Sequence, residues 1–205
     1  MTPAQRILLL GRNRRTVLYD TFTGADTTAL SSHNLNISPA GGAWTNLNGT
    51  NTILGNQAIC TAVPTLGSVK KEAGISDGII TADVTCTTSA AAVNAGIYAR
   101  CVDENNGWRI GFRDSGLFQI IKRDAGVQTT TQTAFTFVDA SVYKVEVTLN
   151  GSAVIARLFL AGVQQGSTIT VIDSFQQGIT THGLQWGDTY AVEAITIDNF
   201  LMTTL

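Results

Sequence analysis

The sequence lacks long apolar runs, and it has few of the residues on which most catalytic and metal sites depend. No apolar run approaches the ~20 residues of a membrane-spanning helix, so no membrane span is predicted. Only two histidines are present, His33 and His182, and neither lies beside a strained Ser or Cys motif. We therefore expect neither to be a catalytic base. A Gly-rich phosphate loop is also missing, which argues against that class of nucleotide site.

Cysteine is scarce and dispersed. Cys60, Cys86 and Cys101 stand singly, without the C-x-x-C spacing of a zinc site or the density of a disulfide scaffold. Cys86 and Cys101 continue period-2 apolar patterns, which place them on the inner faces of strands. We therefore expect free, buried thiols that behave as small hydrophobic side chains. With so few ligands, a transition-metal site is not expected.

The carboxylates lack the grouping that glycoside hydrolases need. In a retaining hydrolase two carboxylates flank one glycosidic bond about 5 Å apart, and an E-x-D-x-E strand would supply them on one face. This sequence has no such triplet: Asp83 and Glu146 stand alone on their predicted strands, and Asp103-Glu104 belong to a turn. We expect no enzymatic activity.

The residues that are abundant favour β structure. The chain is rich in Thr, Val and Ile, has 20 Gly and only 14% charged residues, and its 44% hydrophobic content can fill one core. From about residue 76, alternating segments bounded by Gly, Asn and Asp recur, which is typical of an antiparallel sandwich or barrel. Asn150-Gly151 is predicted to be a type I′ hairpin turn, and 103–107 and 113–116 further turns. Residues 23–50 are predicted to form a long ordered loop.

The three tryptophans are expected to divide between core and surface. Trp44 and Trp108 are predicted to fill the core, since buried aromatics dominate sandwich interiors. Trp186 lies between glycines in "GLQWGDTY" and is predicted to be exposed in a loop.

The positive charge is concentrated at the N-terminal end. Residues 1–15 contain four of the 13 basic residues and none of the 15 acidic ones, and their apolar stretch "ILLL" is too short for a signal peptide. A solvated, disordered tail is one interpretation. Because such a tail gains nothing from four aliphatic residues, we favour a partner-docking arm over residues 1–16, before a domain at 17–205. Its docking residues would be Ile7, Leu8, Leu9, Leu10, Arg12, Arg14 and Arg15.

Strand alternation predicts a basic outer face. Successive side chains of a strand point to opposite faces. If the apolar residues of these strands face the core, the basic and other polar residues between them face outward. Arginine suits carboxylates, sulfates and phosphates, and a tyrosine can stack on a sugar. The alternative is that these side chains only keep the sheet soluble. The predicted glycan- or anion-binding face consists of Tyr98, Arg100, Arg109, Arg113, Arg123 and Arg157, and Gln119, Lys144 and Glu146 are predicted to be exposed with it.

Four segments carry a family resemblance: "LYDTFTGADTTALSSHN", "GGAWTNLNGTNTILGNQA", "AGIYARCVDENNGWRIGF" and "AITIDNFLM". They resemble the concanavalin A-like lectin/glucanase (LamG-like) jelly roll, in the version found in bacteriophage structural proteins. The resemblance implies an all-β sandwich of two antiparallel sheets over about residues 17–205, with "LYDTF" beside "IDNFL". Asp20 and Asp198 could then meet and hold calcium, although two carboxylates that cap turns would explain them equally. No other cofactor is expected.

Two functions from different classes follow from these observations. The first is a non-enzymatic bacteriophage virion structural or decoration protein, associated with capsid or tail and anchored by the N-terminal arm. Its partners would be other virion proteins and further copies of itself, and its location the virion, after synthesis in the host cytoplasm. The alternative is a lectin-like module that recognises surface glycans. No specific nucleic-acid partner is expected.

Overall fold

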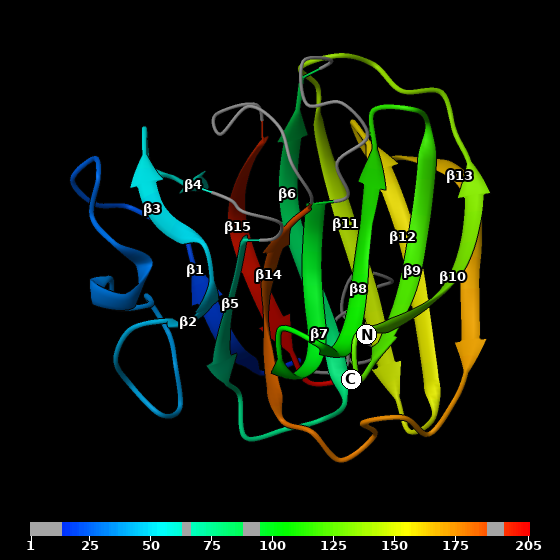
Figure 1. Ribbon diagram of the computed structural model, residues 1–205, viewed down its shortest axis with the longest axis horizontal. Coiled ribbons are helices and arrows are strands. Elements are labelled where there is room, and N and C mark those ends of the chain that lie inside the picture. Colours follow the sequence, from blue (N-terminus) through cyan, green and yellow to red (C-terminus); the bar gives the residue numbers. More distant parts are fainter. Residues whose placement is uncertain (1–13, 63–66, 88–94, 188–194) are drawn as a thin grey trace, which may run out of the picture.

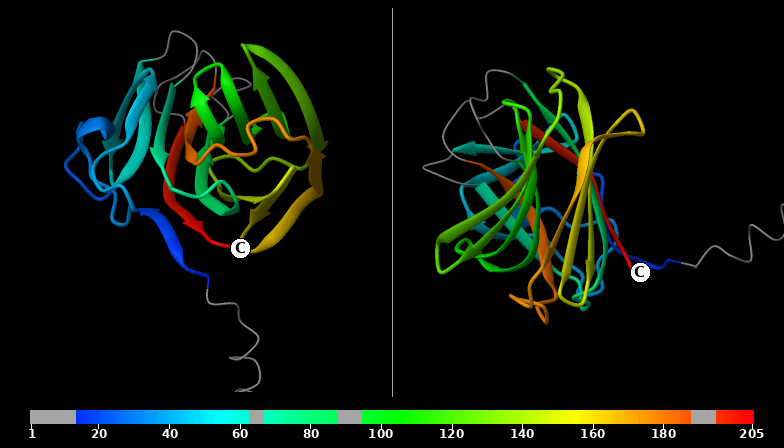
Figure 2. Two further views of the ribbon diagram at one scale, coloured as in Figure 1. Left: turned by 90° about the horizontal axis from the view of Figure 1, so that it is seen from below. Right: turned by 90° about the vertical axis from the view of Figure 1, so that its right-hand side faces the viewer.

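The computed structural model describes residues 14–62, 67–87, 95–187 and 195–205, which form two antiparallel sheets packed face to face (Figures 1 and 2). The eight-stranded sheet has the order β13 (Val163–Ile172), β12 (Ala153–Leu160), β11 (Val142–Asn150), β6 (Gly78–Cys86), β15 (Ile195–Thr203), β4 (Gln57–Ala62), β3 (Thr50–Leu54), with β1 (Thr16–Asp20) also paired to β15. The seven-stranded sheet has the order β10 (Val127–Ala134), β9 (Leu117–Asp124), β8 (Asn106–Arg113), β7 (Ala95–Asp103), β14 (Thr181–Trp186), β5 (Gly67–Glu72), β2 (Thr45–Asn48). The predicted jelly-roll sandwich is confirmed.

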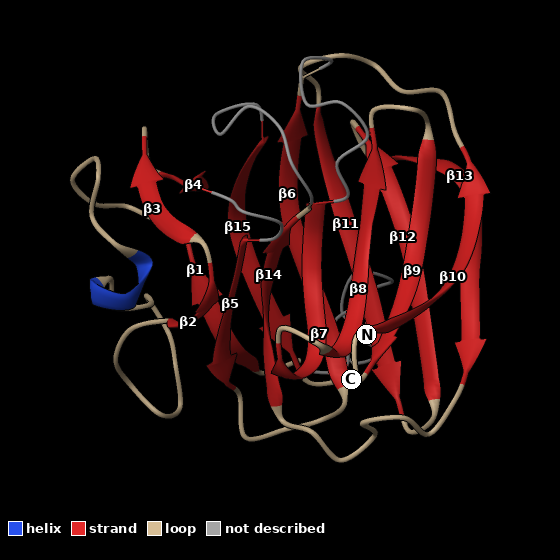
Figure 3. Cartoon of the chain, viewed as in Figure 1, coloured by secondary structure: helices blue, strands red, loops and turns tan. Residues whose placement is uncertain are grey.

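Helix is nearly absent from the described residues, as Figure 3 shows. The 3-10 helix η1 (Leu30–Ser32) is three residues long. In the described ranges, no helix has both the length and the apolar character needed to cross a membrane.

The core is built by alternation on both sheets. In β6 every second residue is buried, so Ile80 and Val84 face the inner side of the seven-stranded sheet, where Ile97 and Ile110 are buried as well. Trp44 and Trp108 are buried, as predicted. Cys60, Cys86 and Cys101 are free and buried, also as predicted. Burial raises the pKa of Cys86 and of Cys101 to about 12, so these two thiols are poor nucleophiles at neutral pH.

The prediction for Trp186 is wrong. Trp186 is the last residue of β14, where it pairs with Gly67, and its side chain is 3% exposed. The flanking glycines predict a loop. However, Gly183 is a strand residue that allows close backbone approach, because a Cβ at this position would lie 1.8 Å from the Val69 carbonyl oxygen.

The terminal strands lie side by side, as the resemblance implied. β1 runs antiparallel to β15, with Tyr19 opposite Leu201 and Asp20 opposite Phe200. The pairing continues to Arg15, whose N–H donates to Thr204 Oγ1 (3.1 Å) and whose carbonyl accepts from Thr204 N–H (3.0 Å). The sheet therefore takes in the last residues of the segment assigned to the arm. Ile7 to Leu10 and Arg12 lie outside the described residues.

The β11–β12 hairpin differs in detail from the prediction. Asn150 pairs with Ala153, so the loop residues are Gly151 and Ser152. Gly151 has a φ of +55°, and Ser152 is not among the residues with positive φ. A type I′ turn needs positive φ at both central residues, so the tight turn exists but is shifted by one residue and is of another type.

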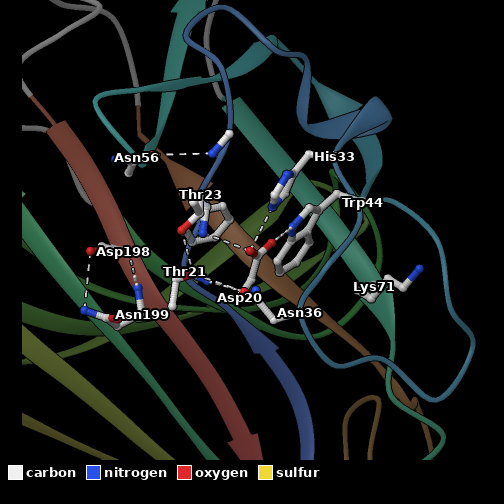
Figure 4. Close-up of polar contacts among 12 residues, drawn as sticks. Asp20, Thr21, Thr23, His33, Asn36, Trp44, Asn56, Lys71, Asp198 and Asn199 are labelled. Atoms are coloured by element: carbon white, nitrogen blue, oxygen red, sulfur yellow. Dashed lines mark hydrogen bonds and ion pairs between the residues drawn. The ribbon is translucent and has the colours of Figure 1, made fainter.

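The ordered loop is shorter than predicted, because β2 begins at Thr45 and β3 at Thr50. Residues 21–44 are held by the carboxylate of Asp20, which is fully buried (Figure 4). Its Oδ1 accepts from Phe22 N–H (2.9 Å) and His33 Nε2 (2.9 Å), and its Oδ2 accepts from Trp44 Nε1 (2.7 Å). Lys71 Nζ holds the C-terminal end of the loop, because it donates hydrogen bonds to the carbonyls of residues 41, 42 and 43.

This arrangement does not bring Asp20 and Asp198 together as a calcium site. Both oxygens of Asp20 face the core and are occupied by protein donors. Asp198 lies on the outer side of β15, and its carboxylate accepts from the backbone and side chain of Asn199. Within the described ranges, no three His, Cys, Asp or Glu side chains form a group that could hold a metal ion.

Candidate functional site

The candidate site is built around the tip of the β7–β8 hairpin. β7 and β8 pair regularly up to Ala99, after which the register shifts, and pairing resumes only at Asp103 and Asn106. Arg100, at the start of this irregularity, has a φ of +46°. Irregularities of this kind bend a strand out of the sheet and redirect its side chains.

The bend carries the hairpin tip across the outer face of the seven-stranded sheet. Lys70 of β5 donates through Nζ to the carbonyl of Val102, and Asn48 of β2 donates through Nδ2 to Glu104 Oε2 (2.6 Å). Because β14 lies between β7 and β5 in this sheet, these contacts require the tip to pass over β14. In Figure 1 the tip lies in front of β14.

Tyr98 and Arg109 lie beneath the tip, and the prediction that they are exposed is wrong. Their side chains face outward on paired strands, but they are only 0% and 4% exposed. Tyr98 Oη donates to the Asp103 carbonyl (2.6 Å), Arg109 Nη2 donates to the Glu104 carbonyl (3.0 Å), and the guanidinium lies 5.6 Å from the tyrosine ring centroid. Burial raises the pKa of Tyr98, so its hydroxyl stays protonated and serves as a donor.

Arg113 and Arg123 share this face with Tyr98 and Arg109. Arg123 Nη2 donates to Asn105 Oδ1 at the hairpin tip (2.8 Å). Arg113 lies further along β8, where its Nε donates to Gln119 Oε1 (3.1 Å). Gln119 is 4% exposed and donates to Gln132 Oε1 (2.6 Å), so its predicted exposure is also wrong. Four of the six predicted face residues are thus on one side of one sheet.

Arg100 and Arg157 do not belong to this face. The unusual backbone of Arg100 turns its buried guanidinium toward the other sheet, where Nη2 donates to Asp77 Oδ1 (2.8 Å) and to the Gly151 carbonyl (2.8 Å). Arg157 lies on β12 of the eight-stranded sheet and pairs with Glu146 (2.9 Å). Lys144 lies on that sheet too, paired with Asp83 (3.1 Å). Alternation predicts to which face of its strand a side chain points. It does not predict to which sheet that strand belongs.

The groups that remain accessible form a compact polar surface. We call them the turn cluster; its partly exposed members are Asn48, Lys70, Glu104, Asn105 and Arg123. Amide, carboxylate, ammonium and guanidinium groups can hydrogen-bond sugar hydroxyls as donors or acceptors. Each member already contacts another part of the protein, so little side-chain freedom remains to be lost on binding.

Four of these five residues, all except Arg123, are not predicted by the sequence. The "DENNG" segment predicts only a turn, and nothing in its pattern shows that the turn folds back over the sheet. Asn48 and Lys70 are 56 and 32 residues away from their partners in the turn. Only the strand order brings them together.

No protein-family model matches the sequence, and no curated protein matches it. Solved structures do match the fold. The carbohydrate-binding module CBM66 from Bacillus subtilis is 16% identical, with a TM-score of 0.57 over 77% of this chain and 92% of that one. The CBM2 module of the evolved Dit of Lactobacillus casei BL23 phage J-1 is 12% identical, with a TM-score of 0.55 over 94% of this chain and 97% of that one.

A third structure is the exoplasmic/lumenal domain of VIP36 in a form bound to Ca²⁺ and Man2. It is 7% identical, with a TM-score of 0.59 over 88% of this chain and 87% of that one. Identities this low establish architecture and leave function to the residues of each site. The chain therefore has the jelly-roll sandwich fold shared by these lectin-like and carbohydrate-binding modules.

Proposed function

We propose that the chain is a non-enzymatic carbohydrate-binding module and that the turn cluster is its glycan-binding surface. The observation that carries the proposal is the fixed hairpin tip, which holds five polar side chains on the outer face of a sheet. The fold supports it, since the similar CBM66 and VIP36 structures are a carbohydrate-binding module and a Man2-bound domain.

The charge of the turn cluster suits hydroxyl-rich ligands. Lys70 and Arg123 supply donors, Glu104 supplies an acceptor, and the amides of Asn48 and Asn105 can do either. Hydrogen bonds to charged groups are stronger than those between neutral groups, so a few of them can select one arrangement of sugar hydroxyls. The absence of a catalytic step is part of the proposal.

Binding should depend on the turn cluster. We expect Arg123→Gln and Glu104→Gln each to weaken binding of the chain's preferred oligosaccharide by about 10-fold, because each removes a charged hydrogen-bonding group. Isothermal titration calorimetry measures this, after an array of mannose-, glucose-, galactose- and fructose-containing oligosaccharides has identified the ligand. The same oligosaccharides should yield no reducing sugar on incubation with the protein.

Arg113→Gln, further along β8 on the same face and outside the turn cluster, is the matched control and should leave that affinity unchanged. Affinity that survives both turn-cluster changes would move the glycan site elsewhere. Release of reducing sugar that disappears in Glu146→Gln would show that the protein is an enzyme.

The likeness to the phage J-1 Dit module supports a second aspect of the proposal, that the chain is part of a bacteriophage virion. The two chains match over almost their whole lengths. We propose attachment to capsid or tail through the N-terminal arm, residues 1–16, where aliphatic residues can be buried in a partner's groove and the arginines can pair with acidic groups.

Deleting residues 1–13 should leave the domain folded with an unchanged melting temperature, because the backbone pairing with the last strand starts at Arg15. The truncated protein should not be incorporated into particles. Replacing Arg12, Arg14 and Arg15 with Ser should weaken attachment most at low salt, since charges at an exposed rim are screened as salt rises. Quantitative mass spectrometry of purified particles gives the occupancy. Wild-type occupancy of the truncated chain would show that the arm is only a tail.

A further inference from the structure

The outer face of the eight-stranded sheet, which lies behind the seven-stranded sheet in Figure 1, has a depression of its own. Its volume is about 380 Å³, within the range of about 300–1,000 Å³ of ligand pockets. Three adjacent strands, β6, β11 and β12, and the turn after β12 form it. The lining residues are Asp83, Val142, Lys144, Glu146, Phe159, Ala161 and Gly162.

Strand register explains why an aromatic ring and charged groups meet here. Lys144 lies directly opposite Phe159 on one side and Asp83 on the other. In the next outward-facing row, Glu146 lies opposite Arg157. Directly opposite side chains in an antiparallel pair are about 5 Å apart at Cβ, so the ring, the ammonium group and the carboxylates belong to one surface.

The two carboxylates of the depression are held in place by neighbouring side chains. Asp83 Oδ1 pairs with Lys144 Nζ (3.1 Å), and Oδ2 accepts from Asn199 Nδ2 (3.0 Å). Glu146 Oε1 accepts from Arg157 Nη1 (2.9 Å), whereas no donor from the described part of the chain reaches Oε2. The Lys144 side chain is 50% exposed. The depression therefore presents a fixed acceptor and an accessible donor.

Apolar groups complete the lining. Phe159 is partly exposed, Val142 is 54% exposed, and Ala161 and Gly162 are too small to cover the ring. A pyranose has one face rich in C–H groups and hydroxyls at its edge. An accessible aromatic side chain beside charge-assisted acceptors and donors complements both parts of such a ring.

The charge of the depression selects among sugars. Asp83 and Glu146 are each paired with one basic side chain, and Asp198, which lies opposite Asp83 on β15, has no basic partner among the described residues. The surface thus carries an excess of negative charge, which disfavours acidic sugars. We propose that this depression is a second carbohydrate site, which takes one neutral hexopyranose unit and acts independently of the turn cluster.

A nuclear magnetic resonance titration of the full chain tests this proposal. The probes are methyl mannoside, methyl glucoside, methyl galactoside and, as the acidic comparison, methyl glucuronide. A single sugar ring should bind with a dissociation constant on the order of 1 mM. We expect at least one neutral glycoside to shift amide signals of β6, β11 and β12 around Lys144 and Phe159, with the glucuronide at least 5-fold weaker.

Two conservative variants test the depression without unfolding the protein. Phe159→Leu keeps an apolar side chain and Glu146→Gln keeps the shape, and each should weaken binding by about 5-fold or more. Arg123→Gln, in the turn cluster, should not change these shifts. The titration therefore tests binding at the depression independently of glycan binding at the turn cluster. The proposal is overturned if no neutral glycoside shifts these strands, if both depression variants bind normally, or if the glucuronide binds as well as the neutral sugars.

Discussion

Replacing Asp20 with alanine is expected to lower the free energy of unfolding by about 4 kcal/mol. Its carboxylate is fully buried and accepts from Phe22 N–H, His33 Nε2 and Trp44 Nε1. Each buried donor left without a partner costs about 1–3 kcal/mol, and loss of one member of a buried charged network is similarly severe. Asp20→Asn keeps the shape and one acceptor, so a loss of about 2 kcal/mol is expected.

Urea unfolding measures both losses, and proteolysis supplies an independent readout. Because Asp20 joins β1 to the 21–44 loop, cleavage of the Asp20→Ala variant should begin within that loop. Asp124→Ala, at an exposed position of β9, is the control and should change stability by no more than about 0.5 kcal/mol. Equal stability of the Asp20→Ala and Asp124→Ala proteins would disprove the role of Asp20 as the anchor of the loop.

Acidification from pH 7 to pH 4 is expected to remove about 3 kcal/mol of stability through His182 alone. The pKa of this ring is lowered to about 4, chiefly by burial; Arg100 also lowers the pKa, whereas the Ile75 carbonyl, Glu72 and Asp77 act in the opposite direction. Nε2 donates to the Ile75 carbonyl (3.0 Å), and Nδ1 accepts from the Arg100 N–H (3.2 Å). A proton on Nδ1 would face that N–H, so protonation breaks the contact.

The sign follows from the two pKa values of His182. Between the ordinary value of 6.5 and about 4, the unfolded chain binds a proton on this ring and the folded chain does not. Stability therefore falls as the pH falls through this window, with no further loss from His182 below it. Urea unfolding at several pH values should show a smaller acid loss for His182→Gln than for the wild type. Equal losses in the two proteins would show that another group is responsible.

The sequence was sufficient to predict the features that depend on local alternation. The period-2 segments indicated an antiparallel sandwich or barrel and the burial of Cys86 and Cys101. The usual burial of aromatics in such cores placed Trp44 and Trp108 inside, and the resemblance specified the two-sheet sandwich and the pairing of the terminal strands. These features hold because one buried face imposes its pattern on every strand. The position of the β11–β12 turn was predicted only to within one residue, since "NG" has two possible alignments with the hairpin.

The binding surfaces could not be predicted in the same way, because they depend on which strands are neighbours. Arg109 and Arg157 both face outward, as alternation indicated, yet they lie on different sheets. Arg100 departs from alternation because its backbone is irregular. Asp83 and Glu146, which are far apart in the sequence, line one depression through the pairing of β6 with β11.

The most direct measurement of the central claim, that this is a glycan-binding module, is an array of neutral and acidic oligosaccharides probed with the full chain and with Arg123→Gln. The proposed function predicts that the wild type retains a small, structurally related set of glycans and that the variant loses most of the signal at equal protein concentration. No retained glycan on an array that includes bacterial-surface oligosaccharides, or an identical pattern for the two proteins, would contradict glycan binding through the turn cluster.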